Sequence, residues 1–247
     1  MSSVLAPESE LNPLLYLAQL VANESQLFTH AQSPFRASVY EGTGNILVVT
    51  GENASGKSIF FQSMAYRAKT QLNALGIQIS IRERTGAGTY EGSGFRRALM
   101  FGDESEQSTG ATSVGVVASG FRNAISYATD DKRNVLMLDE PELGLSAGYS
   151  RAMGEYLAQQ AATLPDKALG VVVVTHSRDL VWGIIAGGGG STPNFVNLDP
   201  KPQNLGEWLT NSENRTIAEL LNLQKIGHER AAQVRALLRD KPAKPAK

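Results

Sequence analysis

The sequence predicts an α/β fold in which a mainly parallel β-sheet is covered by helices on both faces. The prediction depends on three short aliphatic runs, at residues 45–50 (NILVVT), 134–138 (NVLML) and 170–175 (GVVVVT). Continuous apolar runs of this length are typical of strands that are buried on both faces. Segments with helical spacing of apolar residues separate them. Strands that alternate with helices form parallel sheets.

The remaining elements are predicted from apolar spacing and from turn residues. A helix is expected from Lys57 to about Leu75, with Gly76 as its C-cap. A second helix is expected to begin at about Ser113 and to reach Ala128. The other expected elements are a helix at 11–28, a turn at 41–44, a strand at 77–81, an exposed loop at 85–94, a helix at 150–164, a flexible break at 187–190, an edge strand at 195–198 and a helix at 217–238.

These elements suggest one main domain at residues 1–212, a C-terminal helix at 213–240 and a basic tail at 241–247. Hydrophobic residues make up 42% of the 247 residues, which is enough for one sizeable core. The tail, Lys-Pro-Ala-Lys-Pro-Ala-Lys, has nothing to pack with and is expected to be disordered.

The charge and the residue usage exclude several classes of protein. A formal net charge of −1 excludes a polyanion-binding chain as a whole, although residues 225–247 hold seven Lys or Arg against Glu229 and Asp240. The chain has no cysteine, which excludes disulfides and Cys-ligated metals. Residues 1–10 lack the basic and apolar parts of a signal peptide, and no apolar run approaches the ~20 residues that span a bilayer. We expect a cytoplasmic protein without membrane insertion.

A glycine-rich loop follows the first predicted strand and precedes a helix. It reads Gly51-Glu52-Asn53-Ala54-Ser55-Gly56-Lys57-Ser58 and fits the pattern G-x-x-x-x-G-K-S. Glycines let backbone N–H groups turn inward around phosphates, and the helix N-terminus adds a positive dipole end. Lys57 can reach the β- and γ-phosphates, and the Ser58 hydroxyl can ligate Mg²⁺. The loop predicts binding of ATP with Mg²⁺, and the alternative is a chance glycine-rich turn.

Polar side chains follow the other two buried strands. Asp139 ends the 134–138 run, where an acid can hold Mg²⁺, and Glu140 next to it can deprotonate an attacking water. His176 follows the third strand and can sense the γ-phosphate by hydrogen bonding. Alone, the two acids would be read as a solvated turn and the histidine as structural, as we read His30 and His228. Together with the loop they indicate a catalytic site.

The glycine loop, then Val-Leu-Met-Leu-Asp-Glu-Pro-Glu-Leu-Gly-Leu-Ser at 135–146, then Thr-His-Ser at 175–177, resembles an ABC-type ATPase of the P-loop NTPase fold. By this resemblance Asp139 matches the Walker B acid, Glu140 the catalytic glutamate and His176 the switch histidine. Residues 143–146 fall at the D-loop but lack its usual aspartate. In that superfamily two heads sandwich two ATP molecules, so the resemblance implies a head-to-tail homodimer.

Over about residues 34–180 the chain is most similar to the ATPase domain of MutS-type proteins. Gly110-Ala-Thr112-Ser113-Val114 matches the signature G-x-S-T-F, except that valine replaces phenylalanine. The resemblance implies that Gly110, Thr112 and Ser113 contact the partner's ATP. Another register places the signature at 108–111, as in SMC or transporter heads. Pro34-Phe35 resembles the Pro-Phe whose aromatic ring stacks on adenine, with Tyr40 and Phe28 as rival candidates.

The target of the ATPase cycle stays open at this stage. An ATP-closed dimer could clamp DNA with the basic C-terminal segment and with Arg82, Arg84, Arg96 and Arg97. Alternatively the chain is the nucleotide-switch subunit of a multi-protein defence, chromosome-maintenance or transport complex that does not touch DNA. A small-molecule kinase is disfavoured because Asp139, Glu140 and His176 suit activation of water. Mismatch repair does not follow, because the chain has no room for a mismatch-reading or clamp domain.

Overall fold

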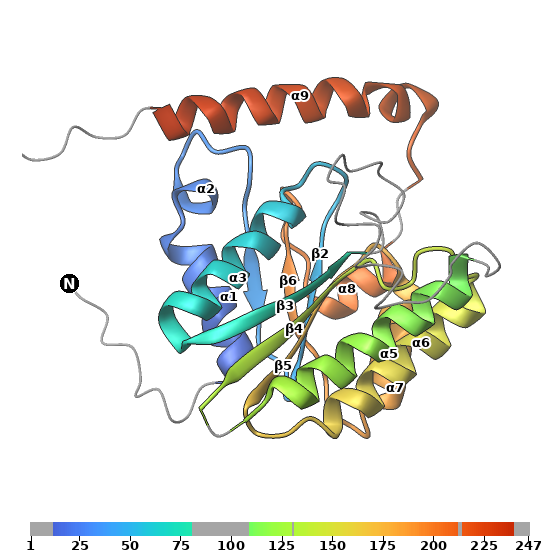
Figure 1. Ribbon diagram of the computed structural model, residues 1–247. Coiled ribbons are helices and arrows are strands. Elements are labelled where there is room, and N and C mark those ends of the chain that lie inside the picture. Colours follow the sequence, from blue (N-terminus) through green and yellow to red (C-terminus); the bar gives the residue numbers. More distant parts are fainter. Residues whose placement is uncertain (1–11, 81–108, 130, 212–213, 240–247) are drawn as a thin grey trace, which may run out of the picture.

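A computed structural model describes residues 12–80, 109–129, 131–211 and 214–239 of the chain. The described part is an α/β fold built on a six-stranded sheet of order β1-β6-β2-β5-β4-β3 (Figure 1). Strand β1 pairs antiparallel with β6, and every other neighbouring pair is parallel. The predicted mainly parallel sheet is therefore confirmed.

The strands are β1 (Ser38–Tyr40), β2 (Ile46–Thr50), β3 (Ala74–Ser80), β4 (Arg133–Asp139), β5 (Ala168–Val174) and β6 (Asn194–Asn197). The helices are α1 (Pro13–Glu24), α2 (Gln26–Thr29), α3 (Lys57–Leu72), α5 (Thr109–Tyr127), α6 (Ala147–Ala162), α7 (Arg178–Gly187), α8 (Leu205–Thr210) and α9 (Ile217–Arg239).

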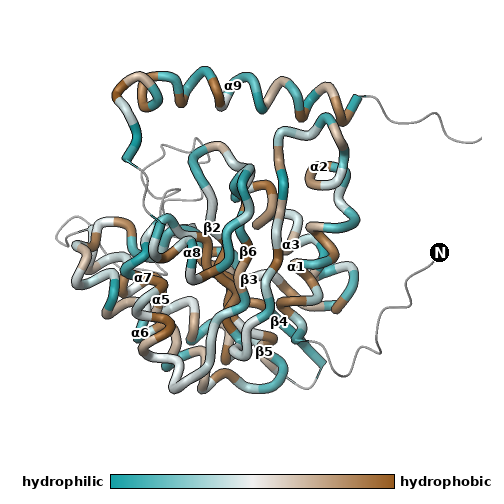
Figure 2. The backbone as a smooth tube through the Cα atoms, turned by 180° about the vertical axis from the view of Figure 1, so that it is seen from behind, coloured by the Kyte–Doolittle hydropathy of each residue, from teal (hydrophilic) through white to brown (hydrophobic). Residues whose placement is uncertain are grey.

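Alternate residues of the central strands supply two separate cores, one on each face of the sheet. In β2, Leu47 and Val49 face the core that α1 and α3 cover, whereas Ile46 and Val48 face the core covered by α5, α6, α7 and α8. Strands β4 and β5 alternate in the same way. Hydrophobic segments are accordingly concentrated in the central strands (Figure 2). This two-sided burial explains the unbroken aliphatic runs in the sequence.

Two helix ends differ from the sequence-based prediction. Helix α3 ends at Leu72, where Asn73 adopts a left-handed backbone (φ +47°) and caps the helix by donating its N–H to the Ala68 carbonyl. Gly76, the predicted cap, lies inside β3, where an added Cβ would come within 3.2 Å of Ala65 Cβ and Met137 Sδ. Asparagine is the other common residue for a left-handed cap, so the prediction chose the wrong one of two nearby signals.

The predicted helix at 11–28 is two helices. Helix α1 begins after Asn12, whose side chain accepts hydrogen bonds from the N–H groups of Leu14 and Leu15. Ser25 has an extended backbone (φ −78°, ψ 120°), which ends α1 and precedes the single turn α2. The helical spacing of apolar residues continues across this break because both helices contribute to the same core, α1 with Val21 and α2 with Phe28.

The β1–β6 side of the sheet and the two helices α7 and α8 differ more strongly from the prediction. Strand β6, predicted at an edge, lies between β1 and β2. Strand β1 occupies that edge and was missed, as were α7 and α8. Helix α7 has a sequence signal: the Ser177 side chain caps it by accepting from the N–H of Leu180. Arg178 then fixes α7 to α8, because its Nε donates to the Trp208 carbonyl at 2.8 Å.

Helix α9 confirms the predicted C-terminal helix at 217–238 and contains no buried residue. It lies across the side of the molecule where the loop between β2 and α3 is found (Figure 1). Among the described residues, no helix is long and apolar enough to cross a membrane. The predicted loop at 85–94, the four arginines near it and the tail at 241–247 lie outside the described residues.

Helices α6 and α7 pack without space for a side chain at their crossing, which generates a stability prediction. A Cβ at Gly183 of α7 would overlap the carbonyl oxygen of Arg151 in α6. Gly183→Ala should therefore lower the free energy of unfolding by roughly 1–3 kcal/mol, measured by urea denaturation. The control is Gly115→Ala in α5, where a Cβ would meet nothing within 4 Å. It should stabilise the protein by up to about 1 kcal/mol, and equal losses for both variants would contradict the prediction.

Candidate nucleotide-binding site

The carboxyl ends of three parallel strands bring the motifs of the sequence together. The register places Val49 of β2 beside Val174 of β5, and Val174 beside Asp139 of β4. The next backbone groups continue this ladder, because the Thr175 N–H donates to the Val49 carbonyl at 3.1 Å and the Glu140 N–H to the Val174 carbonyl at 2.9 Å. The glycine loop, the Asp139-Glu140 pair and His176 therefore leave the sheet at one edge.

The loop 51–58 turns sharply between β2 and α3. Gly56 (φ +97°) and Ala54 (φ +61°) both lie in the left-handed region. The Nζ atom of Lys57 reaches back across the loop and donates to the carbonyls of Gly51 at 2.8 Å and Glu52 at 2.7 Å. Helix α3 begins at Lys57, so its N-terminal N–H groups and its positive dipole end adjoin the loop.

Two further features of the loop concern Ser55 and Gly51. The hydroxyl of Ser55 is buried, and no described group serves as its hydrogen-bond partner. Buried hydroxyls without a partner are uncommon, and a bound oxyanion would provide one. Gly51 is required at the other side of the loop, because a Cβ there would come within 2.6 Å of that hydroxyl oxygen. The loop therefore encloses a polar centre too narrow for a larger residue at position 51.

Glu140 and His176 face each other across the ends of β4 and β5. Glu140 Oε1 lies 3.8 Å from His176 Nε2, and the Glu140 side chain is 8% exposed against 36% for His176. The backbone at Glu140 is left-handed (φ +50°). Such a conformation costs about 1–3 kcal/mol in a residue other than glycine, and it is concentrated at functional sites. The arrangement places a largely desolvated carboxylate next to a partly exposed imidazole.

Asp139 and Ser58, the two predicted Mg²⁺ ligands, differ in their surroundings. Asp139 is half-buried and its Oδ2 accepts a hydrogen bond from the Ser80 hydroxyl at 3.1 Å, across the β3–β4 register. Ser58 is exposed in the first turn of α3. Within the described ranges no group of three or more His, Asp or Glu could hold a metal by itself. A hydroxyl and one carboxylate suit Mg²⁺, which keeps several waters and shares ligands with substrate phosphates.

Glu142 is a further acid at this edge that the sequence analysis left without a role. Its Oε1 accepts a hydrogen bond from the Thr175 hydroxyl at 2.5 Å, while its Oε2 is buried without a described partner. Burial raises the pKa of the Glu142 carboxyl to about 7, although the bond from Thr175 works in the opposite direction. The nearby charges of Glu140 and Asp139 also contribute to this increase in the pKa. In the sequence, Glu142 could have been found as the third acid of the run Asp139-Glu140-Pro141-Glu142.

Phe35 lies in the core beside the glycine loop and not on an exposed surface. It is 4% exposed, belongs to the core that α1 and α3 cover, and its ring centroid lies 6.1 Å from that of Phe28. A Cβ at Gly56 would come within 3.0 Å of the Phe35 ring. The ring therefore packs against the glycine loop from the core side, and its stacking on adenine stays a prediction. Of the rival aromatics, Phe28 is also buried, and the Tyr40 ring packs against Phe195 at 6.1 Å.

The predicted signature residues Gly110, Thr112 and Ser113 lie inside the first turns of α5, and all three are buried. The helix thus includes Gly110 and Thr112, which precede its predicted start at about Ser113. The Ser113 hydroxyl donates to the Leu143 carbonyl at 2.7 Å and to the Thr109 carbonyl at 2.9 Å. A Cβ at Gly110 would meet Leu145 within 2.8 Å. These residues fix the start of α5 to the segment 143–146, and residue 108 lies outside the described residues.

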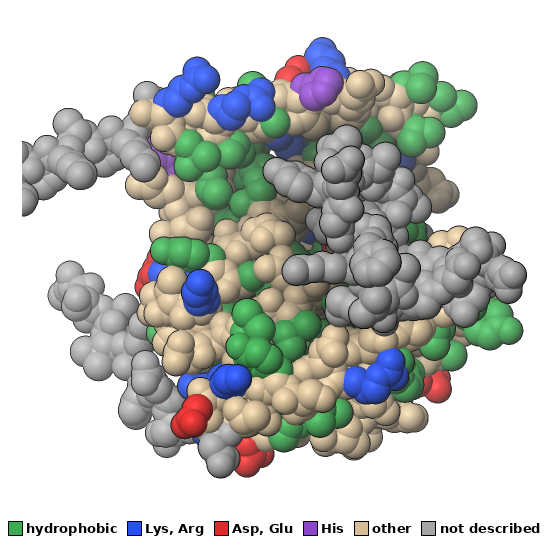
Figure 3. Space-filling model, in the orientation of Figure 1, with side chains coloured by type: hydrophobic (Ala, Val, Ile, Leu, Met, Phe, Trp, Pro, Cys, Tyr) green, Lys and Arg blue, Asp and Glu red, His purple; other side chains and the backbone are tan. Residues whose placement is uncertain are grey.

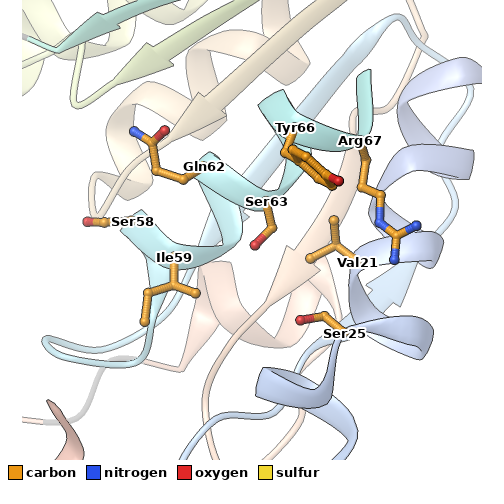
Figure 4. Close-up of a pocket in the computed structure, with 8 residues that line it drawn as sticks. All are labelled: Val21, Ser25, Ser58, Ile59, Gln62, Ser63, Tyr66 and Arg67. Atoms are coloured by element: carbon orange, nitrogen blue, oxygen red, sulfur yellow. The ribbon is translucent and has the colours of Figure 1, made fainter. Parts of the chain in front are cut away.

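One hollow borders the loop at Ser58 and another borders it at Gly51 and Glu52. One, of about 560 Å³, runs along the outer side of α3 between Ser58 and Tyr66, and Figure 4 shows the side chains that line it. Of the predicted site residues, Ser58 lines this hollow. The other, of about 340 Å³, lies between the loop, His176, Arg178 and Arg215. On that side Glu52 is held twice: its N–H donates to Asp199 Oδ1 at 2.6 Å, and its carboxylate forms an ion pair with Arg215.

Comparison of the chain with protein-family models found no match. Comparison with curated proteins found no match either.

The raised pKa of Glu142 generates a prediction about stability and pH. Because the folded state holds this proton up to about pH 7 and the unfolded state releases it near 4.5, the free energy of unfolding should fall as pH rises between these values. Glu142→Gln removes the titration, so its stability relative to the parent should increase over that window, by on the order of 3 kcal/mol. Urea denaturation at several pH values measures this difference. A difference that is constant with pH would contradict the prediction.

Proposed function

We propose that this chain is an ATPase that binds Mg²⁺-ATP at residues 51–58 and hydrolyses it to ADP and phosphate. The observation that carries the proposal is the meeting of three strand ends at one edge of the sheet. There the glycine loop of β2 lies beside Asp139-Glu140 of β4 and His176 of β5. Fold geometry of this kind gathers ligands at the carboxyl ends of parallel strands. The ABC-type ATPase is the member of the fold class that the order of the motifs favours.

The residues of the loop would bind and neutralise the phosphates. Lys57 now donates to two loop carbonyls, so its ammonium is already held at the mouth of the anion-binding turn. The N–H groups of the loop, the Ser55 hydroxyl and the dipole of α3 add neutral donors. Ser58 and Asp139 would hold Mg²⁺, which neutralises charge on the phosphates during transfer.

Glu140 is the proposed general base. Its carboxylate is 8% exposed and lies 3.8 Å from the imidazole of His176. A positioned general base contributes about 10²–10⁴-fold to the rate. His176, being more exposed, would hydrogen-bond to the transferred phosphoryl group and keep Glu140 oriented. The left-handed backbone at Glu140 maintains this orientation.

The resemblance to ABC-type ATPases extends the proposal to a dimer and to a target that the ATPase cycle moves. Two chains would enclose ATP head to tail, and closure would move DNA bound to basic segments or move a protein partner. A protein partner, in a switch subunit that does not contact DNA, is favoured by one observation on α9. Its first turns expose Ile217, Leu220 and Leu221 by 77%, 62% and 76%. Exposed apolar clusters commonly mark protein interfaces.

Substitution of Lys57 tests nucleotide binding. Lys57→Ala should remove measurable binding of ATP in calorimetry, because the loop then lacks its cation for the phosphates. Lys69→Ala is the control, since Lys69 is an exposed lysine on the same helix. Thermal unfolding of both variants verifies that they are folded. Equal ATP affinity of Lys57→Ala and the parent would contradict the proposed site.

Substitution of Glu140 tests hydrolysis separately from binding. Glu140→Gln should lower turnover by at least about 100-fold while ATP still binds, and the ATP-bound form should elute as a dimer in gel filtration. Glu41→Gln is the control, because Glu41 is exposed near the opposite edge of the sheet, beside the start of β6. Unchanged turnover of Glu140→Gln would exclude its role as the base.

A further inference from the structure

A cavity of about 430 Å³ lies between the glycine loop and α9. Its floor consists of residues 53–59 and Phe35, and its roof of one face of α9 that includes Gly227, Arg230, Ala231 and Arg235. His176 also lines it. The volume falls within the range of about 300–1,000 Å³ that small-molecule sites occupy. The outer surface of the phosphate loop therefore has a roof, which comes from the C-terminal end of the same chain.

Helix α9 is attached to the molecule largely through the glycine loop. Arg230 Nη1 donates to the Ala54 carbonyl at 2.8 Å. Arg215, just before the helix, pairs with Glu52. The apolar contribution is small, because α9 has no buried residue and its Val234 packs only partly against the core that contains Phe35. A helix held in this way will respond to any change in the loop.

The charge of the cavity suits an anion. Lys57, Arg230 and Arg235 line it, and no Asp or Glu is among the described residues that do so. Along α9, Lys and Arg side chains are visible on the surface as well (Figure 3). Arg230 now donates to a neutral carbonyl, and an arginine–phosphate contact would be shorter and stronger than such a bond.

The roof also leaves room for a bulky group. Gly227, which has no side chain, and Ala231, one turn further on, both line the cavity, and a Cβ at Gly227 would meet nothing within 4 Å. Glycine in a helix interior costs about 1 kcal/mol relative to alanine. The combination of cations and small residues fits a ligand that is anionic in one part and wide in another, as a nucleoside polyphosphate is.

We propose that α9 forms the roof of the nucleotide site in its own chain, with Arg230 and Arg235 as further nucleotide-binding residues opposite the glycine loop. The inference rests on the proposed function. It adds α9 as a further side of the nucleotide site, beside the glycine loop, Asp139 and His176. Nucleotide binding would then fix α9 in place, because Arg230 contacts both the loop and the ligand side of the cavity. The exposed apolar side chains at the start of α9 would be fixed with it.

Calorimetric titration of the full chain with Mg²⁺-ATP tests this proposal through two pairs of variants. Arg230→Ala is paired with Arg239→Ala, which removes the same side chain from the end of α9, away from the cavity lining. Ala231→Phe fills the cavity and is paired with Ala232→Phe, an exposed neighbour outside the lining. Each pair perturbs the helix to a similar extent. Circular dichroism verifies that all four variants keep their helical content.

Arg230→Ala and Ala231→Phe should each weaken ATP binding at least about tenfold, as loss of a charge-assisted hydrogen bond does, while both controls bind like the parent. Parent-like or tighter binding by Arg230→Ala and Ala231→Phe would overturn the proposal. If Lys57→Ala still abolishes binding in that case, the proposed function stands and only the role of α9 fails. A parent chain that binds no ATP would refute both.

Discussion

The site depends on the hydrogen-bond register that joins β2, β5, β4 and β3. Val49, Val174, Asp139 and Ser80 form one row across the sheet. This row explains why residues 51–58, 140 and 176 emerge at the same height, and why Ser80 reaches the Asp139 carboxylate. A slip of one residue in any pair would turn every side chain of the slipped strand to the other face. The two-sided burial of the aliphatic strands prevents such a slip, so the cores on both faces determine the geometry of the site.

Acidic and basic side chains lie close together at the carboxyl ends of these strands, and Lys57 and Glu140 among them are buried. Asp139 ends β4, and Glu140 and Glu142 follow it. Lys57 belongs to the glycine loop after β2, and His176 follows β5. Close carboxylates repel each other, and burial penalises their charged forms. The molecule resolves this by keeping the Glu142 carboxyl protonated up to about pH 7, hydrogen-bonded to Thr175. Glu140 is then directed toward His176 by its left-handed backbone.

Helix α9 links this site to the outside of the molecule. Arg230 of α9 and Arg215 just before it both contact the glycine loop, whereas the apolar contact of α9 with the core is slight. Its first turns expose a hydrophobic cluster, at Ile217, Leu220 and Leu221. A change in the loop on binding a ligand would therefore alter how α9 presents that cluster. Elements with few buried apolar contacts are the ones that move in conformational switching.

Local sequence determined the three central strands, the glycine loop between strand and helix, and the polar residues at the strand ends. These features have short-range causes: unbroken aliphatic runs, glycines at left-handed positions and acids that follow a buried strand. Only the tertiary structure decided that β6 lies inside the sheet, that Phe35 supports Gly56 from the core, that Glu142 is desolvated and that α9 covers the loop. Each of these depends on contacts between residues far apart in the chain. Arg230 and Ala54 are 176 positions apart, and no local pattern encodes which distant surface a helix will cover.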